Sequence, residues 1–248
     1  MSLLVPPRPP SRELLDNPDF PPDLLEPYLD DLGLVNRLWG NSRLLAGYLE
    51  KNADGGGDAP LTVLDVGAGS GEVSSDLAKR LSRKGRRASV IALDLQWRNL
   101  AVGRSRDGAL AACAGNAFEL PFGDRSADWV VSTLTLHHFS PDESVLLLRE
   151  IARVARIGFA LVDIRRHRFP LAFFSVAGRL GLGTRESLED GIASVRQSYT
   201  PDEARKIAAR AVPGALVKRV FPYRLLVFKP PSASPAVDCR LSTVDSSH

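Results

Sequence analysis

The stretch that decides the fold is Val-Leu-Asp-Val-Gly-Ala-Gly-Ser-Gly-Glu, Val63–Glu72. An apolar run, 61–66, leads directly into three alternating glycines and then into a helix-forming stretch, 71–81. Glycine tolerates backbone angles that other residues avoid and lets a ligand approach the backbone closely. The first turn of the following helix offers unpaired N–H groups. The pattern therefore predicts a buried strand, a ligand-binding loop and a helix, with the ligand at the carboxyl edge of a parallel sheet.

The spacing of the glycines restricts the kind of ligand. Dinucleotide-binding loops follow Gly-x-Gly-x-x-Gly/Ala, whereas here the glycines are at 67, 69 and 71 and the sixth position is Glu72. An acidic residue at the start of the helix disfavours a pyrophosphate, which is itself anionic. The phosphate-binding pattern Gly-x-x-x-x-Gly-Lys-Ser/Thr does not occur in the chain. We therefore expect a ligand without phosphate groups.

Short apolar runs alternate with helical stretches in the rest of the chain. The runs predict strands at 61–66, 88–93, 110–114, 129–133 and 158–162, with a closing hairpin of 216–220 and 224–228. The sequences Ser-Pro-Asp-Glu at 140–143 and Thr-Pro-Asp-Glu at 200–203 are typical helix starts. This alternation predicts an α/β fold with a mostly parallel sheet covered on both faces by helices.

Composition divides the chain into segments. Residues 1–21 are rich in proline and predict an extended arm, and 22–52 predict an N-terminal helical lid with breaks near Gly33 and Gly40. The main domain is expected over 53–229, starting with a Gly/Asp-rich linker. The division is completed by an inserted substrate lid at 165–199 and a disordered tail at 230–248.

The overall composition excludes several classes of protein. Of the 248 residues, 44% are hydrophobic and 25% are charged, which is typical of a soluble globular protein. No apolar run approaches the ~18–20 residues of a membrane span, and the first residues lack the layout of a signal peptide. Cys113 and Cys239 form neither a disulfide framework nor a metal-ligand spacing, so we expect no metal and a cytoplasmic location. The net charge of +3 is too mild for a nucleic-acid binder.

Four motifs occur in a fixed order. They are Asp-Val-Gly-Ala-Gly-Ser-Gly at 65–71, the acid Asp94 at the end of the second strand, Gly-Asn-Ala-x-x-Leu-Pro-Phe at 115–122 and Leu-His-His-Phe at 136–139. Together they resemble the class I S-adenosylmethionine-dependent methyltransferases, especially the branch typified by ubiquinone and menaquinone methyltransferases. The resemblance implies a Rossmann-like, seven-stranded sheet and S-adenosyl-L-methionine as the cofactor. The stretches 163–168 and 190–203 further resemble small-molecule methyltransferases of polyketide-type secondary metabolism.

The resemblance also implies which residues bind the cofactor. By position these are Asp65, Gly67, Ala68, Gly69, Gly71, Asp94, Leu95, Asn116, Ala117 and Thr133. Asp65 would orient the loop and reach the methionine amino group through water, and Asp94 would bind the ribose hydroxyls; for both, capping a helix or turn is the alternative. Asn116 stands where the family usually has Asp facing the adenine amino group. Because an amide oxygen accepts the same hydrogen bond, we expect weaker cofactor binding rather than none.

His137 and His138 follow the fourth strand beside the cofactor edge and are the expected catalytic residues. A hydroxyl acceptor must lose its proton, and histidine is the natural base near neutral pH. We expect His137 to act as base or to orient the substrate. Because the paired histidine recurs in the wider family where no base is needed, the alternative is that it has no such role.

The inserted lid is the expected substrate site. Its apolar side chains either form the core of the insert or line a pocket for an aromatic or alkyl substrate. The expected substrate-binding residues are Arg166, His167, Phe173, Arg196 and Tyr199. For each arginine, a surface salt bridge is an equal alternative.

Three hypotheses about function follow. The first is methyl transfer to a small aromatic or polyketide-like acceptor at oxygen, the second is C-methylation of a quinone-type precursor, and the third is a non-catalytic S-adenosylmethionine-binding partner protein. Amino-directed methylation of nucleic-acid bases is discounted because Ser-Thr-Leu-Thr at 132–135 replaces the Asn/Asp-Pro-Pro-aromatic tetrad. We expect a monomer or homodimer with a small-molecule substrate, without nucleic acid or an integral membrane segment.

Overall fold

The computed structural model describes residues 5–9, 13–17, 19–52 and 60–231. The expected linker at 53–59 and almost all of the expected tail lie outside the described residues. Within the described ranges, no helix is long and apolar enough to cross a membrane.

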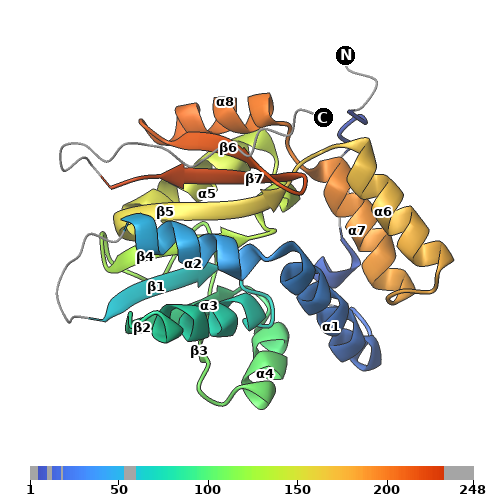
Figure 1. The fold of residues 1–248 in the computed structure, drawn as a ribbon, viewed down its shortest axis with the longest axis horizontal. Helices are drawn as coiled ribbons and strands as arrows, with labels where there is room; N and C mark the ends of the chain where they lie inside the picture. Colours follow the sequence, from blue (N-terminus) through green and yellow to red (C-terminus); the bar gives the residue numbers. More distant parts are fainter. Residues whose placement is uncertain (1–4, 10–12, 18, 53–59, 232–248) are drawn as a thin grey trace.

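A single seven-stranded sheet organises the described residues, in the order β3-β2-β1-β4-β5-β7-β6 (Figure 1). Its strands are β1 (Leu61–Val66), β2 (Ala88–Asp94), β3 (Ala111–Ala114), β4 (Ala127–Thr133), β5 (Ala155–Ile164), β6 (Leu216–Val220) and β7 (Arg224–Lys229). Neighbouring strands from β1 to β5 are parallel, whereas β7 is antiparallel to both β5 and β6. The predicted fold class is therefore confirmed, with β6 of the hairpin forming the sheet edge.

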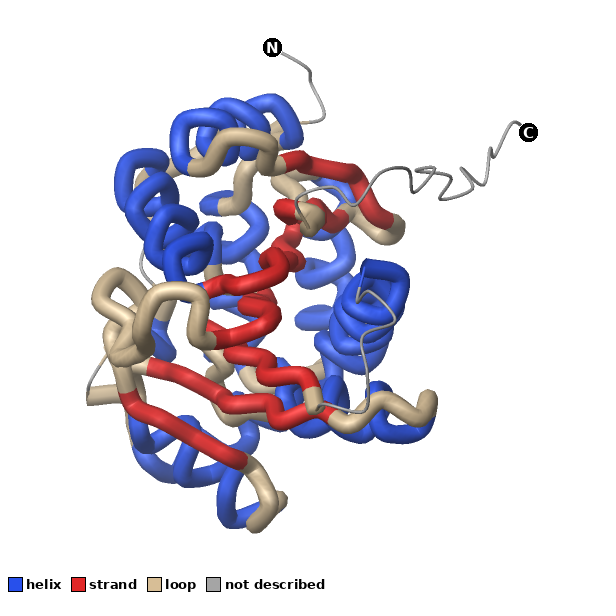
Figure 2. The backbone as a smooth tube through the Cα atoms, turned by 90° about the vertical axis from the view of Figure 1, so that its left-hand side faces the viewer, coloured by secondary structure: helices blue, strands red, loops and turns tan. Residues whose placement is uncertain are grey.

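Helices cover both faces of the sheet (Figure 2). They are α1 (Pro22–Trp39), α2 (Asn41–Asn52), α3 (Glu72–Arg83), α4 (Trp97–Arg106), α5 (Pro141–Val154), α6 (Arg168–Arg179), α7 (Arg185–Gln197) and α8 (Pro201–Ala211), with 3-10 turns η1 (Leu14–Asp16) and η2 (Leu136–His138). Along β1, Val63 packs with α2 and α3, while Leu64 and Val66 pack with α5 and α8. Burial on both faces explains why the strands are continuous apolar runs rather than alternating ones.

The helix boundaries follow local chemistry. Ser140 and Glu143 form a reciprocal capping box at the start of α5, as the sequence predicts. Gly40 adopts a left-handed conformation (φ 66°) and ends α1. The predicted break at Gly33 is wrong, because α1 continues through it: a β-carbon there would lie 1.7 Å from the Glu72 carboxylate, so glycine serves close packing instead.

Two segments distant in sequence, α1 and the α6–α7 pair, meet at one end of the sheet (right side of Figure 1). Asp31 of α1 accepts hydrogen bonds from Thr184 N and Ser187 Oγ, both at 2.6 Å. Tyr28 donates its hydroxyl to Asp190 of α7 at 2.8 Å. These contacts join the two segments beside the carboxyl ends of the strands.

Two glycines offer a matched test of the packing. A β-carbon on Gly158 in β5 would lie 2.4 Å from the Lys229 carbonyl oxygen and 2.9 Å from the Trp129 ring, whereas one on Gly47 in α2 would meet nothing within 4 Å. We expect Gly158→Ala to lower the free energy of unfolding by about 1–3 kcal/mol. Gly47→Ala should raise it by about 0.5–1 kcal/mol, because alanine favours the helix. Urea unfolding measures the free energy of unfolding of both variants. If the two substitutions change it equally, the packing described is contradicted.

Candidate active site

The glycine loop between β1 and α3 is folded tightly at the carboxyl edge of the sheet. Gly67, Gly69 and Gly71 all have positive φ, at 71°, 57° and 73°. The N–H groups of Gly67 and Ala68 both donate to the carbonyl oxygen of Leu93, at 2.8 and 2.9 Å. A β-carbon on Gly67 would lie 2.6 Å from the side chain of Thr135. The backbone conformation therefore disfavours larger residues at all three positions, and lack of space excludes them at Gly67 and Gly71.

Asp94, at the end of β2, ties this loop to the next turn. Its Oδ2 accepts from Gly69 N and its Oδ1 from Gln96 N, both at 2.8 Å. The carboxylate is half-buried and lines a cavity. The capping role raised from the sequence is therefore present, on a side chain that also faces the ligand space.

Asp65 lies beneath the loop and is 1% exposed. Burial raises the pKa of its carboxyl to about 7, even though Ser74 donates to Oδ2 at 2.6 Å. Its other oxygen has no hydrogen-bond partner among the described residues. Asp65 and Gly71 support the loop from behind, without lining the cavity.

A cavity of about 780 Å³ extends from the glycine loop to the lid helices. The expected cofactor residues that line it are Gly67, Ala68, Gly69, Asp94, Leu95, Asn116, Ala117 and Thr133. Its other end is apolar and includes Leu34, Leu38, Trp39, Phe173, Phe174 and Leu188. The volume is within the range of small-molecule sites. One cavity therefore joins the loop to a second, apolar compartment.

His137 also lines this cavity and is 2% exposed. Its Nδ1 is 2.7 Å from Asp163 Oδ1 at the end of β5, and its Nε2 is 3.2 Å from Glu13 Oε1. Burial alone would lower its pKa, but the charges and hydrogen bonds of Asp163 and Glu13 raise it to about 10. With both carboxylates in place, the ring is an imidazolium that donates from both nitrogens.

This pairing makes stability depend on pH. The pKa of His137 is raised from 6.5 when unfolded to about 10 when folded, so its contribution is complete below about pH 6.5 and is lost as the pH rises toward 10. We expect the difference in free energy of unfolding between wild type and His137→Asn to shrink between about pH 7 and pH 9.5.

His167→Asn is the control for this measurement. Burial and the nearby Arg165 lower the pKa of His167, so this residue is neutral across that pH range. Its difference from wild type should stay constant. A constant difference for His137→Asn as well would contradict the pairing with two carboxylates.

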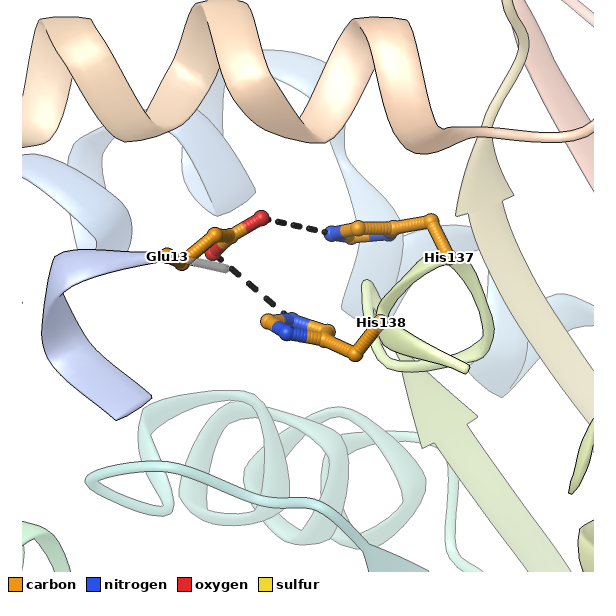
Figure 3. A group of neighbouring side chains, drawn as sticks. All are labelled: Glu13, His137 and His138. Carbon is orange, nitrogen blue, oxygen red and sulfur yellow. Dashed lines mark hydrogen bonds and ion pairs between the residues drawn. The ribbon is translucent and has the colours of Figure 1, made fainter. Parts of the chain in front are cut away.

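Glu13 joins the site from the N-terminal segment, as Figure 3 shows. Its Oε1 also accepts from Ser194 Oγ on α7, and its Oε2 lies 3.7 Å from His138 Nε2. Although burial would raise the pKa of Glu13, the charges of His138 and His137 and the hydrogen bonds to His137 and Ser194 lower it to about 2. The carboxylate is therefore ionised and nearly enclosed.

The residue types around Glu13 are also those of metal sites, and the donor atoms of Glu13, His137 and His138 lie within 4.8 Å of one another. However, the two imidazole rings are stacked, with centroids 4.4 Å apart and planes at 26°. Each Nε2 faces a different oxygen of the same carboxylate (Figure 3). This geometry suits the binding of an anion by two imidazole N–H groups. It is less suited to a metal site, in which the ligand atoms would all point toward one ion.

Of the five expected substrate residues, only Phe173 lines the cavity. Arg166 is 5% exposed and pairs with Glu203 at 2.5 Å, which is the salt-bridge alternative. Tyr199 donates its hydroxyl to the Phe139 carbonyl oxygen at 2.6 Å. His167 caps α6 and stacks on Phe169, and Arg196 is exposed away from the cavity.

Two groups of cavity residues were not assigned to the site from the sequence, although the second lies in the segment 22–52 that was expected to form a lid. Glu13 carries no signal, because it lies in a proline-rich stretch 124 residues from His137. The apolar residues of α1 had one: Leu34, Leu38 and Trp39 continue an apolar stripe that the helix does not bury completely. Such a stripe on a lid helix indicates a pocket wall as well as a core.

Comparison with known proteins agrees with this geometry. A model of the methyltransferase domain matches residues 63–158. The demethylmenaquinone methyltransferase of Beutenbergia cavernae is 39% identical over 100 residues, which are 40% of this chain and 38% of that protein. A ubiquinone/menaquinone biosynthesis C-methyltransferase of Rhodopseudomonas palustris is 32% identical over 187 residues, covering 68% of this chain and 70% of that protein. The chain belongs to the class I S-adenosylmethionine-dependent methyltransferases.

Solved structures of other methyltransferases share the fold. The magnesium protoporphyrin IX methyltransferase of Synechocystis, with bound SAH, has a TM-score of 0.55 at 17% identity, covering 78% of this chain and 83% of that one. The CMeT domain of the citrinin polyketide synthase has a TM-score of 0.57 at 16% identity, covering 77% of this chain and 52% of that one. At these identities the likeness concerns the fold alone.

The loop end of the cavity fits S-adenosylmethionine, the cofactor of this methyltransferase family. The positive-φ glycines leave a cradle that β-carbons would fill, and Gly67 has no room for one. Asp94 and Asn116 place oxygen acceptors along the same wall, suited to hydroxyl and amino groups of a nucleoside. Phosphate-binding side chains are not among the residues lining this end.

Proposed function

We propose that this methyltransferase transfers a methyl group to an acidic hydroxyl of a small aromatic or polyketide-like acceptor. The observation that supports the proposal is one cavity whose lining includes the glycine loop, His137 and a group of apolar lid residues. An acceptor in the apolar end would present its hydroxyl to the imidazole and to the cofactor end at once.

S-adenosylmethionine supplies an electrophilic methyl group on a sulfonium centre, and the chain supplies alignment and exclusion of water. The glycine loop and Asp94 fix the cofactor end of the cavity. The apolar residues Leu38, Trp39 and Phe173 line the other end. Exclusion of water by the bound acceptor against these apolar side chains would favour in-line displacement over hydrolysis.

Removal of the acceptor's proton falls to His137. Asp163 holds Nδ1–H at 2.7 Å, which fixes the tautomer and leaves Nε2 as the proton acceptor. In the arrangement described, Glu13 occupies the Nε2 side. With Glu13 in place, Nε2 carries a proton. His137 therefore acts as a base only after that proton has left with the Glu13 carboxyl group and the acceptor's hydroxyl faces the free Nε2.

C-methylation of a quinone-type precursor is the second candidate. It is favoured by the two relatives, whose names describe methylation of demethylmenaquinone and C-methylation in ubiquinone/menaquinone biosynthesis. An activated ring carbon also depends on an ionised hydroxyl, so the same histidine would serve. The apolar compartment would then hold the quinone ring and the start of its side chain.

One product analysis tests both candidates. The full chain is incubated with S-adenosylmethionine and a panel of phenols, 2-acylphenols and naphthoquinols, and products are assigned by mass spectrometry and NMR. We expect one methyl group on oxygen; a methyl group on a ring carbon would favour the second candidate. Formation of S-adenosylhomocysteine no faster than without acceptor, in a protein that binds the cofactor, would contradict both.

A further inference from the structure

The Glu13 carboxylate lies among three polar groups, called the cradle here: His137 Nε2 and Ser194 Oγ at hydrogen-bond distance, and His138 Nε2 at ion-pair distance. His137 lies 3.2 Å from Oε1, to which Ser194 also donates, and His138 lies 3.7 Å from Oε2 (Figure 3). All four residues line the cavity that the proposed function assigns to the acceptor. A carboxylate of the chain itself thus lies where the proposed reaction needs the acceptor's oxygen.

The segment that carries Glu13 is attached by polar contacts. The N–H groups of Leu14 and Leu15 donate to Asp190 at 2.8 and 3.2 Å. Arg8 donates to the carbonyl oxygens of Gln197 at 2.5 Å and Phe139 at 2.8 Å. Leu15 packs against the small cluster of Phe20, Leu25, Tyr28 and Leu29, and Arg8 lies over the Tyr199 ring. The described residues between 5 and 17 add nothing to the two larger apolar clusters that flank the sheet. Few buried apolar contacts mean that the segment can open without unfolding the domain.

The shape of the cradle defines the chemistry that it accepts. The stacked rings of His137 and His138 each face one oxygen of a planar carboxylate, and a hydroxyl adds a third donor. Two donors side by side recognise a planar pair of oxygens that share one negative charge. Carboxylates have this pair, and so do the enolates of 1,3-diketones and the phenolates of 2-acylphenols.

We propose that Glu13 is a built-in stand-in for the acceptor, and that the cradle of His137, His138 and Ser194 is a subsite for a planar two-oxygen anion. This inference rests on the proposed function, and it names the acceptor class: a compound that carries a carboxylate or an enolised 1,3-dicarbonyl unit. On binding, the acceptor's oxygens replace the Glu13 carboxylate, and Glu13 withdraws with its segment and takes the Nε2 proton to solvent. An enol acceptor then gives its own proton to Nε2 and is held in the cradle as the anion, whereas a carboxylate enters already ionised. His137 then keeps Asp163 at Nδ1 and faces the acceptor through Nε2.

A binding experiment without cofactor tests this subsite. Calorimetry measures the affinity of benzoate, a carboxylate, and of benzoylacetone, an enolised diketone, for wild type, Glu13→Ala and Glu13→Gln. We expect at least one probe to bind Glu13→Ala about tenfold or more tightly than wild type, because no resident carboxylate competes. The probe whose affinity increases more shows whether the cradle prefers a carboxylate or an enolised diketone. Glu13→Gln should show a smaller gain in the same direction, because the amide keeps the shape and loses the charge.

Asp19→Asn is the matched control, because it removes one exposed carboxylate from the same part of the chain. It should leave the affinity of both probes at the wild-type value. Adding His138→Asn to Glu13→Ala should weaken the probe about tenfold by removing one of the donors. In wild type, the probe should also accelerate hydrogen exchange at the Leu14 amide, which is released from Asp190 when the segment withdraws.

If Glu13→Ala, Glu13→Gln and Asp19→Asn all bind the probes with the same affinity, the stand-in role is overturned. It is also overturned if adding His138→Asn to Glu13→Ala leaves the affinity for the probe unchanged. Circular dichroism of each variant establishes that it is folded. The test is separate from the proposed function, because no methyl transfer is measured. Probe binding with this pattern, in a chain that methylates none of the acceptors, would overturn the proposed function alone.

Discussion

Replacing His137 by asparagine is expected to lower kcat for methyl transfer by about 10²–10⁴-fold, the usual contribution of a general base. Asparagine retains a donor that can reach Asp163, but no group at the position of Nε2. Because His137 does not lie in the glycine loop, the affinity for S-adenosylmethionine should stay at the wild-type value. Release of S-adenosylhomocysteine measures the rate, and calorimetry measures the affinity.

His167→Asn is the matched control for this rate. Its ring follows β5 but stacks on Phe169 and makes a tilted contact with Tyr223, outside the lining of the cavity. We expect its kcat to stay within twofold of wild type. A His137→Asn protein that binds the cofactor and retains a third or more of the wild-type kcat would refute the base role.

Replacing Asp94 by alanine is expected to weaken S-adenosylmethionine binding by about 10²-fold. The carboxylate accepts from Gly69 N and Gln96 N and lines the cavity, so its loss frees the loop and removes an acceptor for the cofactor. Hydrogen bonds to charged groups are worth about 1.5–3 kcal/mol each, which sets the size of the effect. Isothermal titration of folded protein measures the affinity directly.

Asp124→Ala provides the comparison for Asp94→Ala. Asp124 is exposed and pairs with Arg153, away from the glycine loop. The affinity of Asp124→Ala for the cofactor should equal that of wild type. The affinity of Asp94→Asn should lie between those of Asp94→Ala and Asp124→Ala. An Asp94→Ala protein within threefold of wild type would contradict the placement of the cofactor.

The parts of the fold that the sequence predicts are those set by local chemistry. β1 is predicted to the residue because an apolar run ends at a glycine loop, and α5 because a capping box marks its start. The break at Gly33 was not predictable in this way. Glycine in a helix has the same sequence signal whether it ends the helix or lets Glu72 approach it closely.

The residues of the candidate site likewise fall into those that local sequence predicts and those that depend on distant contacts. His137 and the glycine loop stand at strand ends, where topology alone places side chains together. Glu13 and the two groups that turn away from the cavity, Arg166 and Tyr199, depend on contacts between distant segments. A charged or hydroxyl residue at a helix end has no periodicity that separates a substrate contact from a structural one.

The most direct test of the central claim is a calorimetric titration of the wild-type protein with S-adenosylmethionine and, separately, with NAD. The glycine loop, Asp94 and Asn116 predict saturable binding of S-adenosylmethionine at one site, with a dissociation constant in the micromolar range, and no binding of NAD. Folded protein that binds no S-adenosylmethionine, or that binds NAD equally well, would contradict the assignment of the cavity.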